Sequence, residues 1–552
     1  MKYRVSIKTL ILSAMLGVSA LVTSCDDDDD DVIQADALFR PIVKESVASG
    51  QWIELNWDRY KGAEYFVLTL SGKAKGQADS TKIEVQTDTT FYRFEGLEYD
   101  TDYYIKIKSV GSNLESKYYN VPVITTSDYP TQLNSVRTVD IQALVSWNEE
   151  DYDVLNLVQV VTPEGSTVSE EVEVLNYEVS PEENESKEVI FNNLEPSSNY
   201  IVRAYSKGVY QGKKVFSTSA EELFEGKVVD LRGLPEEEAY GVLTSSFFAD
   251  TIASNPDQNI TIVLEGGMKY EMASLKLPAT TGVIKMVTGL SLRGNAVLEV
   301  SGNYDIEGYV GGFVAEKITF LDHPSKPRTD SNFGGTYLFN LSVAGSEIGS
   351  IEFINSEIKY KRGVCRVKTG AKIGKYVVNN CVVDSIGGYG IINMDNGDAA
   401  LEDIEIVNST FSHCEKLLVC TKPTSKTINS LDVKNCTFVY NMKGGNNYLF
   451  DFNGFTIVSS AVVKNCIFGP GGNNGEASAI SGARSATAIT FDKCYSTSDC
   501  EWFTAEGATA PTAPIDATST GADVKGTFKD VTNNDFTLLI NDLKEYGDPR
   551  WW

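Results

Sequence analysis

Apolar and polar residues alternate in a short segment that recurs six times between residues 351 and 496. The copies are IEFINSEI (351–358), YVVNNCVV (376–383), IEIVNSTF (404–411), LDVKNCTF (431–438), AVVKNCIF (461–468) and ITFDKCYS (489–496). Alternation with period 2 predicts a β-strand, and in each copy it changes phase at one position. Five copies place Asn there: Asn355, Asn380, Asn408, Asn435 and Asn465. Because Asn tolerates a left-handed backbone, each copy predicts two strands joined by a sharp bend.

The copies follow one another at intervals of 25 to 30 residues, with no helical pattern between them. Such spacing predicts a parallel β-helix, in which each coil stacks about 4.8 Å from the last. A third strand per coil is expected in the apolar runs GVCRVK (363–368), GIINMD (390–395), LLVCTK (417–422) and YLFDFN (448–453). We expect one outward column of these strands to contain Arg366, Asn393, Cys420 and Asp451.

This repeat resembles the right-handed parallel β-helix of pectate lyases and related polysaccharide-active proteins. The resemblance implies a pectin-lyase-like fold for residues 223–552, and it says more about fold than about chemistry. An amphipathic helix over residues 236–256 is expected to cap the first coil, whose unpaired strand edges need cover. The ending, residues 536–552, is expected to pack as a lid on the last coil.

Two segments before the β-helix show short alternating strands separated by turn signals, which is typical of β-sandwiches. The first, residues 37–127, contains Trp57 and the stretch around Tyr103, and the second, residues 128–222, contains a similar stretch around Tyr200. Both stretches resemble the corner motif of fibronectin type III domains. The expected fold class is therefore all-β, with two fibronectin type III-like sandwiches followed by a parallel β-helix.

The chain begins with basic residues, a short apolar run and small residues before Cys25. This pattern indicates a lipoprotein signal peptide over residues 1–24, with Cys25 as the lipidated residue. Residues 26–31 are all Asp, so the segment 25–36 is interpreted as a solvated linker. The layout resembles surface lipoproteins of Bacteroidetes in which fibronectin-like modules precede a pectate-lyase-like domain. It implies an outer-membrane, lipid-anchored, cell-surface protein that works beside outer-membrane glycan-uptake proteins.

Net charge and side-chain chemistry limit the classes of partner, metal and cofactor that we expect. The formal net charge of −28 argues against nucleic acid and against an anionic membrane surface, leaving the lipid as the membrane contact. Only two His are present and no CxxC pair occurs, so we expect no metal site. Outward carboxylates are too scattered to support calcium, so no cofactor is expected. Cys381, Cys436, Cys466 and Cys494 fall at inward positions, where free thiols are favoured over disulfides.

One basic run interrupts the acidic background between Ile358 and Val383. Arg pairs with carboxylates in a fork and Tyr can stack on a sugar face, so this run is a candidate site for an acidic glycan. The predicted glycan-binding residues are Lys359, Tyr360, Arg362, Arg366, Lys368, Asn393 and His413. A solvated basic face that balances nearby acids is an equally weighted interpretation of the same residues.

Two functions from different classes remain open at this stage. The first is a surface protein that binds an acidic polysaccharide, pectin-like or another uronate glycan, within a glycan-utilisation system. The second is a polysaccharide lyase or hydrolase acting on such a glycan, for which Lys368, Arg366 or His413 are the candidate catalytic residues. A structural adhesin is a third interpretation. Sequence leaves the enzymatic question undecided, because binding needs cations and rings whereas catalysis needs a placed base.

Overall fold

The computed structural model describes residues 36–72, 80–329, 333–442, 448–472, 481–502, 512–513 and 515–552. The predicted signal peptide, Cys25 and the acidic run lie outside the described residues. The chain divides into two compact units, residues 1–130 and 131–552, and each is treated by itself below. Among the described residues, no helix is long and apolar enough to cross a bilayer.

The first unit is a β-sandwich. One sheet contains three strands, β1 (Val43–Ser49), β2 (Trp52–Trp57) and β5 (Phe91–Phe94). The other contains β3 (Tyr65–Gly72), β4 (Thr81–Thr87), β6 (Asp102–Val110), β7 (Tyr119–Asn120) and β8 (Ile124–Thr125). Trp57 is buried between the sheets with its ring edge-on to Phe66. The Tyr103 hydroxyl accepts a hydrogen bond from the Glu98 backbone N–H at 2.9 Å, which confirms the predicted corner.

A second sandwich opens the second unit. Its sheets are β9 (Arg137–Thr138), β10 (Ala143–Ser146) and β13 (Glu188–Phe191), and β11 (Val154–Val161), β12 (Glu170–Glu178), β14 (Asn199–Ser206) and β15 (Val209–Ser217), with α1 (Pro181–Ser186) before β13. The Tyr200 hydroxyl accepts from the Glu195 N–H at 2.8 Å, so the corner geometry is repeated. Both sandwiches show the two packed antiparallel sheets of a fibronectin type III domain.

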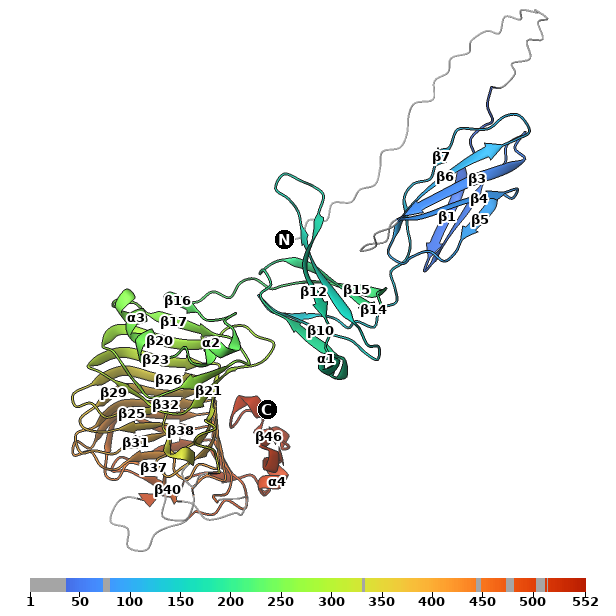
Figure 1. The fold of residues 1–552 in the computed structure, drawn as a ribbon. Helices are drawn as coiled ribbons and strands as arrows, with labels where there is room; N and C mark the ends of the chain where they lie inside the picture. Colours follow the sequence, from blue (N-terminus) through green and yellow to red (C-terminus); the bar gives the residue numbers. More distant parts are fainter. Residues whose placement is uncertain are drawn as a thin grey trace, which may run out of the picture. The chain divides into compact units, whose positions relative to one another are not determined.

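The rest of the second unit is a parallel β-helix built from three sheets (Figure 1). The first sheet contains β16 (Lys227–Asp230), β17 (Ile260–Leu264), β20 (Thr280–Thr288), β23 (Tyr309–Glu316), β26 (Glu347–Ile354), β29 (Lys372–Asn379), β32 (Ala400–Val407), β35 (Thr427–Lys434), β38 (Thr456–Lys464) and β41 (Thr490–Asp492). The second contains β18 (Lys269–Met272), β21 (Ala296–Val300), β24 (Ile318–Asp322), β27 (Glu357–Lys361), β30 (Val382–Ile386), β33 (Thr410–Ser412), β36 (Thr437–Val439), β39 (Ile467–Phe468), β42 (Tyr495–Ser496) and β44 (Thr518–Ser519). The third contains β19 (Leu275–Leu277), β22 (Tyr304–Ile306), β25 (Phe339–Leu341), β28 (Cys365–Val367), β31 (Ile392–Met394), β34 (Leu418–Cys420), β37 (Tyr448–Asp451), β40 (Ser481–Arg484) and β43 (Thr512–Ala513).

The predicted bend between the first and second sheets is confirmed. All five repeat Asn residues are left-handed, with φ between 51° and 54°. Their side chains stack: Asn380 donates to Asn355 at 2.6 Å, Asn435 to Asn408 at 3.0 Å and Asn465 to Asn435 at 3.2 Å. The small residue after each Asn is buried, including the free thiols of Cys381, Cys436 and Cys466.

One detail of the third sheet differs from the prediction. Asn393 pairs with Val419, and Val419 with Asp451, so Val419 rather than Cys420 stands in the outward column. Cys420 is buried. The run LLVC has no polar residue to mark its outward face, so alternation could not fix its phase.

The two ends also differ from expectation. The first coil is covered by two short helices, α2 (Glu236–Tyr240) and α3 (Ser245–Ser254), instead of one. The chain turns after Gly241 and restarts at Thr244, whose side chain caps α3 by accepting from the Phe247 N–H.

The C-terminal segment contains α4 (Val524–Thr527), β45 (Phe528–Asp530), η2 (Val531–Asn533), β46 (Asp535–Leu538), η3 (Asn541–Leu543) and η4 (Pro549–Trp551). It lies along the side of the coils, as Figure 1 shows, and is not a lid on the last one. Its apolar side chains pack on Val439 and Ile467 of the second sheet. Buried Asp548 accepts from the Thr410 hydroxyl at 2.7 Å, which fixes the end of the segment to β33, well before the last coil.

Candidate functional site

The residues of the basic run lie on different sheets of the β-helix. Its first part lies on β27 of the second sheet, its middle forms the turn after β27, and Arg366 lies on β28 of the third sheet. The last two cations, Lys372 and Lys375, lie on β29 of the first sheet. The predicted site residues therefore face three different surroundings, and only some of them come together.

Two arginines and two tyrosines meet at the turn before the third sheet, and we call Tyr337, Arg362, Arg366 and Tyr389 the Arg–Tyr cluster. Arg362 donates to the Tyr389 hydroxyl at 2.9 Å, and its guanidinium lies 4.3 Å from the centre of the Tyr389 ring. Arg366 lies 5.8 Å and 5.5 Å from the ring centres of Tyr337 and Tyr389. The rings meet edge to face at 5.6 Å.

Gly363 makes this arrangement fit. A Cβ atom at Gly363 would stand 2.9 Å from the Tyr389 Cβ and 3.0 Å from the Tyr337 ring. Any larger residue would push the rings apart, because these contacts are closer than side chains normally allow. The pairing of the two tyrosines therefore depends on a glycine inside the basic run.

Arg366 forms an ion pair with Asp395 that leaves part of the guanidinium unused. Nε and Nη2 both donate to Oδ2 of Asp395, the first at 2.8 Å. Nη1 has no hydrogen-bond partner within the part of the chain that the structure describes. Along the sheet, Arg366 stands beside Asn340 on one coil and beside Asn393, which is 6% exposed, on the next.

Several buried polar atoms around the Arg–Tyr cluster lack partners within the described residues. They are the Tyr337 hydroxyl, the Arg362 Nε, the Asn340 Oδ1 and the Thr336 Oγ1. Burial raises the pKa of Tyr337 although the charges of Arg362 and Arg366 oppose the rise, so its hydroxyl keeps the proton at neutral pH. Buried donors without acceptors are uncommon, and here Tyr337 and Arg362 each supply one.

The remaining cations of the run are not part of the cluster. Lys359 lies on the second sheet and pairs with Glu357 at 2.7 Å. Tyr360 is left-handed and is covered by Arg328, whose guanidinium lies 3.9 Å from the ring centre. Lys361 points inward, donates to the Leu321 carbonyl at 2.6 Å and is fully buried. Burial lowers its pKa to about 7.

His413 and Lys368 complete the predicted set. Within the described residues, neither has a hydrogen bond, ion pair or ring contact with the Arg–Tyr cluster. His413 follows β33, two coils beyond β27 and thus roughly 10 Å along the stack. Its Nδ1 lies 2.9 Å from Asp384 Oδ1. Burial of Asp384 opposes ionisation, but hydrogen bonds from His413 and Ser412 outweigh it and lower the pKa of that carboxyl. Lys368 follows the far end of β28, half-buried.

Sequence reasoning missed Tyr337, Tyr389 and Asn340. A signal was present, since a glycine pair precedes each tyrosine, in GGTY (334–337) and GGY (387–389), shortly before a third-sheet strand. Within the described residues, no group of three or more His, Cys, Asp or Glu is arranged to hold a metal ion.

Comparisons with known proteins identify domains but no function. Residues 269–414 match a family model described as a domain of unknown function (DUF4957), and residues 431–551 match another, DUF5123. Each match spans less than half of the chain. The chain is also 29% identical over 153 residues to Tenascin-R of Gallus gallus, a match that spans 28% of this chain and 10% of that protein.

Solved structures of chicken proteins are similar in the sandwich region. A two-domain fibronectin type III segment of tenascin is 16% identical and covers 32% of this chain and 98% of its own, with a TM-score of 0.18. The FN1–FN3 domains of CNTN1 are 17% identical and cover 33% of this chain and 69% of their own, with a TM-score of 0.14.

Proposed function

We propose that this protein binds an acidic polysaccharide, a uronate glycan, at the Arg–Tyr cluster on the third sheet of the β-helix. The observation behind the proposal is the placement of two guanidinium groups against two tyrosine rings, with one carboxylate beside them. Guanidinium groups pair with carboxylates in a fork, and rings offer a face for sugar C–H groups. Asp395 engages Arg366 through one oxygen, so the Nη1 donor is free to reach a ligand carboxylate.

The buried hydrogen-bond donors of the cluster also favour a negatively charged ligand. Tyr337 and Arg362 each present a donor that lacks an acceptor within the described residues, and an anionic ligand supplies acceptors. Because the whole chain has a formal charge of −28, long-range attraction to a polyanion is absent. Affinity must therefore come from these close contacts.

The test compares two arginines on one sheet. Arg484 stands on the third sheet in register with Asp451, binds both of its oxygens at 2.8 and 2.7 Å, and lies 4.8 Å from the Tyr448 ring centre. It matches Arg366 in residue type, sheet and kind of partner, but it is not part of a pair of arginines that share two rings. Affinity electrophoresis and calorimetry with homogalacturonan and other uronate polymers should show Arg366→Ala binding at least tenfold more weakly, about 1.4 kcal/mol.

Arg484→Ala should stay within twofold of the unmodified protein. Equal losses for both variants, or no loss for either, would overturn the site, and the adhesin function would then stand in its place. The same samples also test catalysis, because a lyase releases unsaturated products that absorb in the ultraviolet. Release that depends on Arg366 would replace the binding role with the enzymatic one.

We also propose that a lipid on Cys25 anchors the protein in the outer membrane, with the sandwiches as spacers that present the β-helix to the glycan. Support comes from the signal pattern and from the acidic run that follows it. Cys25→Ser should abolish incorporation of labelled fatty acid and release the protein from the membrane fraction. Retention of Cys25→Ser in that fraction would contradict the anchor.

A further inference from the structure

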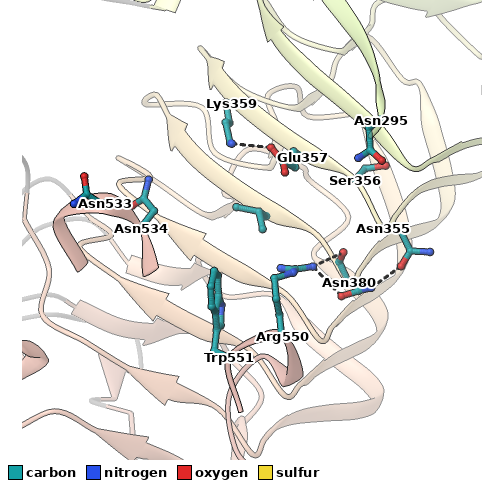
Figure 2. A pocket seen from close by; sticks show the side chains of 11 residues that line it. Asn295, Asn355, Ser356, Glu357, Lys359, Asn380, Asn533, Asn534, Arg550 and Trp551 are labelled. Atoms are coloured by element: carbon teal, nitrogen blue, oxygen red, sulfur yellow. Dashed lines mark hydrogen bonds and ion pairs between the residues drawn. The ribbon is translucent and has the colours of Figure 1, made fainter. Parts of the chain in front are cut away.

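A groove of about 430 Å³ separates the second sheet from the C-terminal segment (Figure 2). Asn355, Asn380 and Lys359 line it from the coils, and Arg550, Trp551 and Asn534 line it from the C-terminal segment. Figure 2 shows Arg550 and Trp551 side by side, with Asn533 and Asn534 across from the Asn355 bend. A volume of this size falls in the range of small-ligand sites.

The charges that border the groove are neutralised in pairs. Lys359 pairs with Glu357 at 2.7 Å, and Arg550 pairs with the fully buried carboxylate of Asp548 at 2.8 Å. Arg550 also donates to the backbone carbonyl and to the side-chain Oδ1 of Asn380, both at 2.8 Å. A charged ligand would therefore have to break an existing pair to bind here.

Arg550 changes the Asn ladder at this position. Asn408 donates to Asn379 at 3.4 Å instead of to Asn380, whose Oδ1 is occupied by Arg550. The ladder thus stops at Asn380 and starts again at Asn408. The Asn355–Asn380 pair belongs to the groove, whereas Asn408, Asn435 and Asn465 continue the stack away from it.

Two of the side-chain amides that line this space have hydrogen-bonding capacity that the chain does not use. Within the described residues, the Asn355 Nδ2 has no partner, and the Asn534 Oδ1 is a buried acceptor without a donor. Each side-chain amide offers donors and an acceptor a short distance apart. Neighbouring hydroxyls of a sugar ring present the same mixture, and Trp551 adds an amphipathic ring whose Nε1 donates to the Thr410 hydroxyl at 2.7 Å.

We infer that this groove binds a neutral saccharide unit through the Asn355 and Asn534 amides beside Trp551. The site goes beyond the proposed function, because it lies between the second sheet and the C-terminal segment and selects against charge. An extended peptide has amides of its own and is the competing ligand. Sugar is favoured because the groove offers amides from both walls and an indole, but only one short apolar side chain, Val382, for a peptide anchor among its described lining residues.

The experiment exploits two residues with one backbone conformation. Asn355 and Asn435 both occupy the left-handed bend, at φ 51° and 53°, and of these two Asn355 lines the groove. Glycine keeps that conformation while it removes the amide, so Asn355→Gly and Asn435→Gly form a matched pair. The probes are xylo-, manno-, cello- and galacto-oligosaccharides of two to four sugars, measured by calorimetry and tryptophan fluorescence on the full chain.

At least one neutral series should bind, with Asn355→Gly at least tenfold weaker and Asn435→Gly within twofold of the unmodified protein. Arg366→Ala should leave this binding unchanged, so failure here and failure of the acidic site are told apart. The inference is overturned if no neutral oligosaccharide binds, if both glycine variants lose affinity equally, or if only unstructured peptides bind in an Asn355-dependent way.

Discussion

The arginines on two flanks of the β-helix have different surroundings. On the flank covered by the C-terminal segment, Arg550 is bound by a carboxylate with no exposed side-chain surface and by two oxygens of Asn380. On the third sheet and in the turn before it, Arg366 and Arg362 contact tyrosine rings, and Arg366 is paired with Asp395. One flank uses its arginine to hold the chain together, whereas on the other the Arg366 Nη1 has no partner within the described residues and is the donor that we propose for a ligand.

The difference follows from how a β-helix places residues. Stacking puts equivalent positions of successive coils about 4.8 Å apart, so a cation can pair along its own strand, as Lys359 does with Glu357, with the next coil, or with a segment outside the coils. Lys359 and Arg550 find theirs within the chain. In the Arg–Tyr cluster, some hydrogen-bond donors have no acceptor within the described residues. These donors are the physical basis of the proposed anion site.

The largest effect is expected from the buried ion pair. Asp548→Ala removes the acceptor of Thr410 and of Arg550 and should lower the free energy of unfolding by about 3 to 5 kcal/mol, because it leaves a charge without its buried partner. Asp451→Ala breaks the more exposed pair with Arg484 and should cost about 1 kcal/mol. Urea denaturation of both variants measures this, and equal costs would mean that the two flanks do not differ as described.

The Asn bend comes next. Asn435→Leu loses two ladder hydrogen bonds and places a branched residue at φ 53°, for an expected cost of about 3 kcal/mol. Asn435→Gly loses the same bonds without the backbone strain, so it should cost about 1 kcal/mol less. Chemical denaturation separates the two contributions. Identical stabilities for the Leu and Gly variants would show that the left-handed backbone is not what Asn provides.

A smaller, pH-dependent effect is expected from Lys361, the cation that the fold buries between the two flanks. Its pKa in the folded protein is about 7, below the ordinary 10.5, because burial outweighs the attraction of Asp322. Between these values the unfolded chain binds a proton that the folded protein does not, so stability rises with pH by at most about 1.4 kcal/mol per unit.

Lys361→Met should remove that rise, which thermal unfolding between pH 7 and 10 would detect as a flatter curve than that of the unmodified protein. Parallel curves for Lys361→Met and the unmodified protein would place the Lys361 amine in a more hydrated setting.

The repeat allowed the β-helix to be predicted from the sequence. Asn at a fixed place, with a phase change in the alternation around it, determined the bend, the inward thiols and the stacking of coils. Local patterns failed where no polar residue marked the phase, as at Val419 and Cys420. The path of the C-terminal segment depends on Asp548 reaching Thr410, a contact between residues 138 positions apart, which no local pattern encodes.

The candidate site was predicted in part for the same reason. Arg362, Arg366 and Asn393 follow from the coil spacing. The structure places both arginines in the cluster, whereas Asn393, beside Arg366 on the next coil, is buried. Tyr337 and Tyr389 come from the coils before and after that of Gly363, so their meeting depends on the stacking of three coils and on the missing Cβ at that position. The inward turn of Lys361 was hidden because the left-handed backbone at Tyr360 shifts the alternation.

The most direct test of the acidic-glycan site pairs a change in the ligand with a change in the protein. Calorimetry would measure homogalacturonan oligomers and their carboxyl-reduced, neutral counterparts against the unmodified protein and Arg366→Ala. We predict that reduction weakens binding to the unmodified protein at least tenfold and weakens binding to Arg366→Ala far less, because both changes remove the same contact. Losses that simply add, or reduced oligomers that bind the unmodified protein as tightly as the acidic ones, would contradict recognition of carboxylates at the Arg–Tyr cluster.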